Sequence, residues 1–450
     1  MNYESEAGEI SIAVAGDTIP TRRWTMFKEE RFLKIREILG GADASFANLE
    51  TNIHRYLDGG HKTHEGGGTY LTTEPEILED LKWLGVNIMA CGSSHADDYG
   101  PDTILKTIEY LDQAGIIHAG SGRHLAEARA PGFLDTPRGR VALVAAMSAR
   151  AEGRAGEQRR DTVGYPGVNG LRYREVYEVD GPTLETLMRI GRDLGWEAEL
   201  GRRRAQGDPE RHGEGSYNFL GHTFTAGPEF AIRSYPNKRD VEENLRQIGY
   251  AKAVADRVIM SLHCHEQGGP TFKMAERRSG VEDLADFAVE FAHQAIDAGA
   301  DIFVGHGPQL QLGIEIYKDR PLFYGMGIFI FQLETVRYLP HEAYERYGLD
   351  ERATPFDFAN TRYAGETRGH PADPLQWEQA FAVCDFAGPT VKEIRLYPIE
   401  LGFGKPRSQR GRPLLAEPAV GERIIDRIAR ISKKYGTVVA YRDGIGVIRP

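Results

Sequence analysis

Side chains that can bind metal ions or transfer protons recur at the ends of short apolar runs in this chain. Asp17 follows one apolar run, and Asn48 and Glu50 close the next one. The same position after later runs is held by His95, His263, His265, Glu266 and His306. Mixed carboxylate and imidazole ligands suit divalent ions such as Zn, Mn or Fe, and such ions activate water for hydrolysis. The residue types therefore indicate a metal-assisted hydrolytic site.

The apolar runs predict buried strands that alternate with helices. The predicted strands span residues 10–15, 44–47, 86–91, 257–262 and 301–304. Helical segments lie between them, including 101–114, which begins with a proline at a favoured first helical position. Buried strands alternating with helices are typical of a largely parallel sheet covered on both faces, so the sequence predicts the α/β class.

The positions of the polar residues relative to these strands predict a shared site. In open α/β sheets, ligands bind in the crevice beyond the carboxyl ends of the strands. Side chains that follow several such strands should therefore meet in space, although they lie far apart in the sequence. The residues expected in one pocket are Asp17, Glu50, His95, His263 and His306.

Residues 149–235 interrupt the alternation of strands and helices. They contain stretches rich in Arg, Glu and Gly and poor in apolar residues, around a predicted helix at 182–194. We interpret this segment as an insertion within a single catalytic domain of residues 1–450, either a lid or a solvated surface excursion. Residues 380–450 are predicted to complete the domain with a strand pair and a C-terminal helix.

The composition excludes several classes of protein. A formal net charge of −11 argues against a nucleic-acid-binding protein, which would usually carry a basic face. The three cysteines are scattered and form neither a disulfide framework nor a zinc-binding pair. We find neither a signal peptide nor an apolar stretch long enough to span a membrane, so we expect a cytoplasmic protein.

The order of the motifs resembles that of a known family. The motifs are Gly16-Asp17, Asn48-Leu49-Glu50, Ser94-His95 with Asp98-Tyr99-Gly100, His263-Cys264-His265-Glu266, Gly305-His306-Gly307-Pro308 and Phe323-Tyr324-Gly325-Met326-Gly327-Ile328-Phe329. Together they resemble the CapA family of capsule and poly-γ-glutamate biosynthesis, within the calcineurin-like metallophosphoesterase superfamily. The resemblance covers most of the chain outside 149–235 and includes Gly411-Arg412-Pro413 in the tail.

The resemblance implies a fold and a set of site residues. The implied fold is a four-layer α/β/β/α metallophosphoesterase-like sandwich that carries the inserted segment. The implied metal ligands are Asp17, Glu50, His95 and His263, with Asn48 beside them. His265, Glu266 and His306 are implied to lie at or close to the metal.

Three positions depart from the family pattern. Ser94, Gln309 and Ile328 stand where the family has Asn, His and Asn. Isoleucine cannot bind a metal, and serine and glutamine bind divalent ions poorly, so an intact two-metal centre is not expected. We therefore predict one divalent ion per chain or none.

The resulting functional hypothesis is metal-dependent hydrolysis of an amide or γ-glutamyl-type bond in a peptide or acidic polymer, in preference to a phosphoester. Asp17, His265, Glu266 and His306 are the predicted catalytic residues, with His306 as the general acid. One alternative is a peptide epimerase of a ribosomal-peptide pathway, with Asp17 and His306 as its acid/base pair. Another is a non-catalytic component of poly-γ-glutamate synthesis or export.

Overall fold

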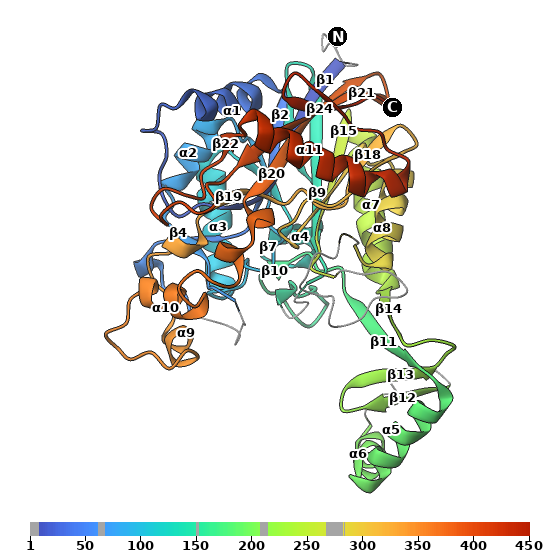
Figure 1. Cartoon of the computed structure of the whole chain (residues 1–450). Helices are drawn as coiled ribbons and strands as arrows, with labels where there is room; N and C mark the ends of the chain where they lie inside the picture. The colour runs from blue at the N-terminus through green and yellow to red at the C-terminus, as the bar shows by residue number, and fades with distance from the viewer. Residues whose placement is uncertain (1–8, 62–67, 150–152, 208–214, 267–281, 283) are drawn as a thin grey trace.

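Strand β1 (Glu9–Ile19) lies at the centre of a ten-stranded sheet (Figure 1). The computed structural model describes residues 9–61, 68–149, 153–207, 215–266, 282 and 284–450. β1 pairs in parallel with β2 (Ala44–Leu49) and with β19 (Ile328–Phe331). The path through this sheet is β23 (Ala440–Arg442), β24 (Ile445–Ile448), β21 (Thr390–Glu400), β20 (Glu378–Ala387), β1, β2, β5 (Ile88–Ala90) and β6 (Ile117–Ala119), with β22 (Leu414–Leu415) beside β21.

A second sheet holds the later parallel strands. Its order is β17 (Ile314–Tyr317), β18 (Arg320–Phe323), β16 (Ile302–His306), β15 (Arg257–His263), β9 (Gly139–Met147) and β8 (Gly132–Thr136). The four inner strands run in parallel, and the two edge strands pair antiparallel to their neighbours. The predicted strands therefore belong to two sheets rather than to one.

Alternating side chains of each strand enter different cores, because successive residues of a strand point to opposite faces. Ile12 and Val14 of β1 pack with Leu143 and Ile259 of the second sheet, so the two sheets share a core. Ala13 on the other face of β1 packs with helices α1 (Glu30–Gly41), α2 (Ile77–Leu84) and α3 (Pro101–Ala114). Helices α7 (Lys238–Val254) and α8 (Asp286–Asp297) cover the outer face of the second sheet. The α/β class is therefore confirmed.

Residues 173–236, which cover most of the segment predicted as an insertion, form a small lobe that projects from the body (Figure 1). Its elements are β11 (Tyr173–Val179), α5 (Gly181–Asp193), α6 (Trp196–Ala205), β12 (Ser216–Phe219), β13 (His222–Ala226) and β14 (Ala231–Pro236), and the strands form one four-stranded sheet. Residues 150–152 and 208–214 of the predicted insertion lie outside the described residues. A role as a lid stays a prediction.

Asp240 in α7 fixes the base of this lobe to the body. Its buried carboxylate accepts hydrogen bonds from Arg129 Nη2 at 2.9 Å and from Arg172 Nε at 2.7 Å. Arg129 ends the short helix α4 (Leu125–Arg129), and Arg172 directly precedes β11. A buried carboxylate shared by two guanidinium groups is costly to disrupt, because loss of one partner leaves a charge uncompensated.

The C-terminal region is more extensive than the sequence predicted. Strands β20 and β21 pair antiparallel, and α11 (Pro418–Ser432) packs Ile424, Ile425 and Ile428 into the core between the sheets. The remaining short elements are β3 (Asn52–Ile53), β4 (Thr72–Thr73), β7 (Ser121–Gly122), β10 (Gly167–Val168), α9 (His341–Glu345) and α10 (Pro355–Arg362). Across the described ranges, we find no helix with the length and apolar character required to span a bilayer.

Candidate metal centre and active-site cavity

The carboxyl ends of parallel strands from both sheets place the predicted residues together. Asp17 near the end of β1 lies in register with Asn48 in β2, and His263 at the end of β15 lies in register with His306 at the end of β16. Gly16 allows β1 to approach the turn before β19, because a Cβ atom there would lie 2.2 Å from the carbonyl oxygen of Gly327. This close approach fixes the backbone that carries Asp17.

A first group of possible metal ligands consists of Asp17, His263 and His306, whose ligand atoms lie within 4.8 Å of one another. His263 Nδ1 is 3.0 Å from His306 Nδ1, and His306 Nδ1 is 3.6 Å from Asp17 Oδ1. The Asp17 carboxylate also accepts hydrogen bonds from Asn48 Nδ2 at 2.7 Å and from the backbone N–H of Gly307 at 3.1 Å. All three possible ligands are fully buried.

A second group consists of Glu50, His263 and His265. His263 Nε2 lies 3.0 Å from His265 Nε2 and 3.9 Å from Glu50 Oε1. The hydroxyl of Ser94 is 3.2 Å from His263 Nε2 and 3.1 Å from His265 Nε2. His263 therefore belongs to both groups and faces each with a different ring nitrogen.

The donor set fits a divalent metal ion. The two groups combine carboxylate oxygens with imidazole nitrogens, a mixture suited to Zn, Mn or Fe. Asn48 Oδ1 adds a buried amide oxygen that has no hydrogen-bond partner among the described residues. A neutral imidazole offers a lone pair on only one nitrogen, so a neutral His263 can bind an ion in one group at a time.

Burial shifts the ionisation of both residues proposed earlier as acid and base. Desolvation raises the pKa of Asp17 to about 7, against the opposing effect of the hydrogen bonds from Asn48 and Gly307. Desolvation lowers the pKa of His306 to about 3, and the neighbouring charge of His265 acts in the same direction. His306 is fully buried, and Ser261 Oγ lies 2.5 Å from its Nε2. Among the described residues His306 is enclosed, and burial favours its neutral form. The general-acid role of His306 stays a prediction.

His95, which the resemblance implies as a metal ligand, lies beside Asp98. It belongs to neither group of possible metal ligands. Its Nδ1 lies 2.7 Å from Asp98 Oδ2, which also accepts a hydrogen bond of 2.7 Å from the backbone N–H of Leu71. The Asp98 carboxylate thus fixes the orientation of the imidazole, as carboxylates commonly do for functional histidines.

A cavity of about 260 Å³ opens beside the second group. Ser94, His95 and His265 lie on its metal side. The remaining lining residues are Ile19, Gly68, Thr69, Leu71, Gly307, Pro308, Gln309, Leu333, Arg362, Tyr363 and His370. Arg362 donates a hydrogen bond to Thr69 Oγ1, and no carboxylate pairs with it in the part of the chain that the structure describes. The cavity therefore carries a cation that is available to an acidic ligand.

The other predicted site residues are dispersed. Glu266 turns away from the metal-ligand groups and accepts a hydrogen bond from Ser148, with Cys264 Sγ 3.1 Å from its Oε2. Gln309 lines the cavity in a left-handed conformation with φ of 62°. Ile328 is buried in register with Asp17 and contributes an apolar side chain there. The geometry thus gives no support to Glu266 as a catalytic residue.

Sequence reasoning missed the residues of this cavity that come from the C-terminal third. Arg362, Tyr363 and His370 lie in a region that has no strand-end signal. His370 is half-buried, and desolvation together with the charge of Arg362 lowers its pKa to about 4. Asp98 could have been found from the sequence as the residue that orients His95. It stands three positions after His95 and belongs to the motif Asp98-Tyr99-Gly100.

Comparisons with known proteins agree with the motif pattern. A family model described as bacterial capsule synthesis protein PGA_cap matches residues 11–333. The proteins y4sH and y4uA of Sinorhizobium fredii, both described as uncharacterized, are 35% identical to the chain over 98% of its length and 93% of their own. The PGA biosynthesis protein CapA of Bacillus subtilis is 32% identical over 25% of the chain and 27% of its own length. A probable polyglutamine synthesis accessory protein of Mycobacterium tuberculosis is 24% identical over 63% of the chain and 54% of its own length.

Replacement of His263 should remove metal binding altogether, because both ligand groups depend on this imidazole. We expect His263→Ala to retain no divalent ion after dialysis, and His95→Ala to retain as much as the unaltered protein, about one ion per chain at most. Elemental analysis of the two purified variants measures this. An equal loss of metal from both variants, or two tightly held ions in the unaltered protein, would contradict the grouping.

Metal affinity should rise with pH up to about 7, because a proton on Asp17 competes with the ion. Asp17 is mostly protonated below its raised pKa and ionised above it, so the affinity should fall about tenfold per pH unit below 7. The pKa of His306 is too low for its protonation to contribute in this range. Competition titrations with a chelator, corrected for the chelator's own protonation, measure the slope. An affinity independent of pH across this window would show that Asp17 does not bind the ion.

Proposed function

Because the chain belongs to the family of bacterial capsule synthesis proteins, we propose that it is a metal-dependent hydrolase that cleaves an amide or γ-glutamyl-type bond in an acidic peptide or polymer. The observation that carries this proposal is the convergence of two groups of possible metal ligands beside a cavity that holds an oriented histidine and a cation. The Bacillus subtilis relative is named a PGA biosynthesis protein and the Mycobacterium tuberculosis relative a probable polyglutamine synthesis accessory protein, and these names support a polyamide chain as the substrate class.

The fold that we assign to the family is the four-layer α/β/β/α metallophosphoesterase-like sandwich. The core shared by the two sheets and the helix-covered outer faces support this assignment. In it, the residues that would hold the metal are Asp17, Glu50, His263, His265 and His306, with the amide oxygen of Asn48 near them. A divalent ion bound there supplies Lewis-acid activation of a carbonyl group or of water.

His95 is the residue that we assign to proton transfer toward the leaving amine. It lines the cavity, whereas His306 is enclosed. Asp98 holds its Nδ1 side, which leaves the Nε2 side for a ligand in the cavity. An amine is a poor leaving group unless it is protonated, so hydrolysis of an amide needs a donor at this position.

Arg362 is the residue that we assign to recognition of the acidic substrate. A guanidinium group binds a carboxylate through two parallel hydrogen bonds. Its hydrogen bond to Thr69 and its position 5.3 Å from the centre of the Tyr363 ring hold the side chain at the cavity wall. The glutamate units of a polymer carry carboxylates that such a group would bind.

The geometry does not favour the epimerase alternative. An epimerase needs an acid and a base on opposite faces of a substrate Cα atom. The two groups suggested for these roles, on Asp17 and His306, are 3.6 Å apart and fully buried, so no carbon atom fits between them.

A non-catalytic role would be supported if the metal-loaded protein cleaved no glutamate-containing chain.

Replacement of His95 should reduce turnover while the metal remains bound. We expect His95→Ala to lower kcat for a γ-linked glutamate oligomer by about 10²–10⁴-fold, the usual contribution of a general acid. Product release followed by chromatography, with metal content measured on the same samples, tests this. His341→Ala serves as the matched control because that side chain is 71% exposed at the surface. Unchanged turnover in His95→Ala would remove the assignment, and absence of cleavage by the unaltered metal-loaded protein would overturn the proposed activity.

Replacement of Arg362 should affect acidic substrates selectively. We expect Arg362→Gln to lower kcat/KM for a γ-glutamate oligomer by about 10–100-fold, in line with loss of a charge-assisted hydrogen bond. Its effect on the same oligomer with amidated carboxylates should be small. Arg352→Gln is the control, since that arginine is 84% exposed. Equal losses on acidic and amidated substrates would mean that Arg362 supports the structure of the cavity rather than recognition of the substrate.

A further inference from the structure

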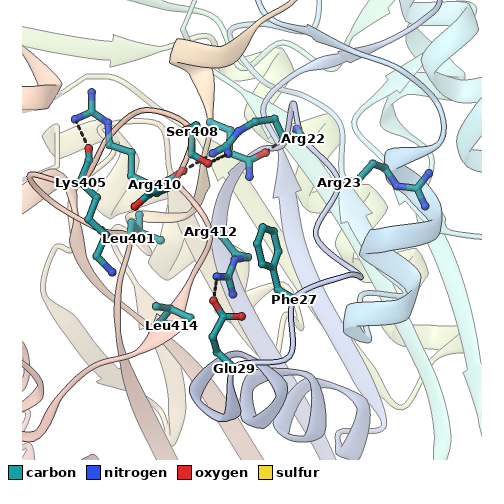
Figure 2. A pocket seen from close by; sticks show the side chains of 13 residues that line it. Arg22, Arg23, Phe27, Glu29, Leu401, Lys405, Ser408, Arg410, Arg412 and Leu414 are labelled. Atoms are coloured by element: carbon teal, nitrogen blue, oxygen red, sulfur yellow. Dashed lines mark hydrogen bonds and ion pairs between the residues drawn. The ribbon is translucent and has the colours of Figure 1, made fainter.

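A second cavity, of about 270 Å³, lies between the segment after β1 and the C-terminal segment 401–414 (Figure 2). Its lining residues are Arg22, Arg23, Phe27, Glu29, Gln332, Leu401, Gly402, Lys405, Ser408, Gln409, Arg410, Arg412 and Leu414. Five of these are cationic and one is acidic. The C-terminal side of the cavity lies beyond the residues that the family model matches, so the family assignment does not account for it.

Contacts with two aromatic rings and one carboxylate fix the guanidinium group of Arg412 in this cavity. It lies 4.1 Å from the centre of the Phe27 ring and 4.6 Å from that of Phe32, and its Nη2 donates a hydrogen bond of 2.5 Å to Glu29 Oε1. Its Nη1 is buried and has no hydrogen-bond acceptor among the described residues. A buried donor left without an acceptor costs about 1–3 kcal/mol, and more when the group is charged.

Arg22 presents a second ordered guanidinium group. Its Nη1 and Nη2 donate to the backbone carbonyls of Ser408 and Arg410, and its Nε donates to Thr335 Oγ1 at 3.1 Å. No carboxylate forms an ion pair with it in the described ranges. Burial lowers the pKa of Arg22, the charge of Arg412 lowers it further, and the charge of Glu334 acts in the opposite direction. Both guanidinium groups line the same cavity, so an anion bound there would be attracted by both.

The other cations differ in how far they are neutralised. Arg410 pairs with Glu334 and Glu366. Arg23 pairs with Asp80 and Glu79 at the opposite side of the cavity (Figure 2). The ammonium group of Lys405 is exposed and makes neither a hydrogen bond nor an ion pair with any described residue. Among the five cations of this cavity, Arg22 and Lys405 are thus the two without a close ion pair in the described ranges.

We propose that this cavity is a binding site for an oxyanion group, a carboxylate or a phosphate, held by Arg22, Lys405 and Arg412. Guanidinium groups match the geometry of both oxyanions. Both arginines are already fixed by aromatic rings and backbone carbonyls, so little side-chain entropy is lost on binding. The oxyanion has two possible sources, a free anion and an acidic chain. A chain bound in the candidate active-site cavity could extend to this one, because Gln332 lines this cavity and the adjacent Leu333 lines the other.

Calorimetric titration of the metal-loaded protein, first with inorganic phosphate and then with a γ-linked glutamate oligomer, tests the site. We expect Lys405→Glu to weaken binding of the true ligand class at least about tenfold, because it replaces an attractive charge with a repulsive one. Lys392→Glu is the matched control, since Lys392 is exposed near the other end of β21. The backbone of Lys405 hydrogen-bonds to Gly402 and Arg410, and these contacts do not involve the ammonium group that the substitution removes. Circular dichroism checks that the variant is folded.

The two ligands separate the possible sources of the oxyanion. Weakened phosphate binding in Lys405→Glu identifies a site for a free anion, whereas weakened binding of the oligomer alone identifies a site for an acidic chain. Arg412→Gln should reproduce whichever effect is found. If Lys405→Glu and Arg412→Gln bind both ligands as the unaltered protein does, or if the unaltered protein binds neither, the proposal is overturned. These readouts are binding constants and do not depend on whether the protein cleaves the oligomer.

Discussion

The imidazole of His263 joins the two halves of the site, and the rest of the arrangement depends on its position. It ends a strand of the second sheet, yet its two nitrogens face partners that include Asp17 and Glu50 of the first sheet. This contact exists only because the two sheets stack with their parallel strands ending at the same edge. The side chain is fully buried, so water does not compete for its nitrogens, and each polar contact around it is stronger than it would be at the surface.

The departures from the family pattern have physical consequences at this position. Ser94 places a short hydroxyl between His263 and His265, where a longer amide side chain would reach further toward an ion. Ile328 stands in register with Asp17 and contributes hydrocarbon on the neighbouring strand. An apolar neighbour adds to the desolvation of the Asp17 carboxylate, which is the largest cause of its raised pKa. A cation would therefore favour the ionised form of Asp17, and ionisation of Asp17 would in turn favour binding of the cation.

Part of this arrangement could be predicted from the sequence, because the strands end at polar residues. The positions of Asp17, Glu50, His263 and His306 follow from that rule alone, and the structure brings them together. The rule could not assign roles, since the enclosure of His306 and the contact of His95 with the cavity depend on the loops that surround them. It also could not tell one sheet from two, because a buried strand has the same apolar pattern in either. The role of Arg362 could not be predicted from the sequence. This residue reaches the cavity from the end of α10, where no apolar strand pattern marks a site.

The lobe formed by β11 to β14 enters and leaves the body at neighbouring points. Tyr173 at its beginning pairs with Pro236 at its end across an antiparallel ladder, so the backbone departs and returns within one strand spacing. Because its two ends are adjacent, this segment can change in length and sequence without moving the strands that carry the possible metal ligands. A shortened lobe would therefore leave the two ends of the adjoining backbone close enough to rejoin, without displacing the strands that carry the ligands.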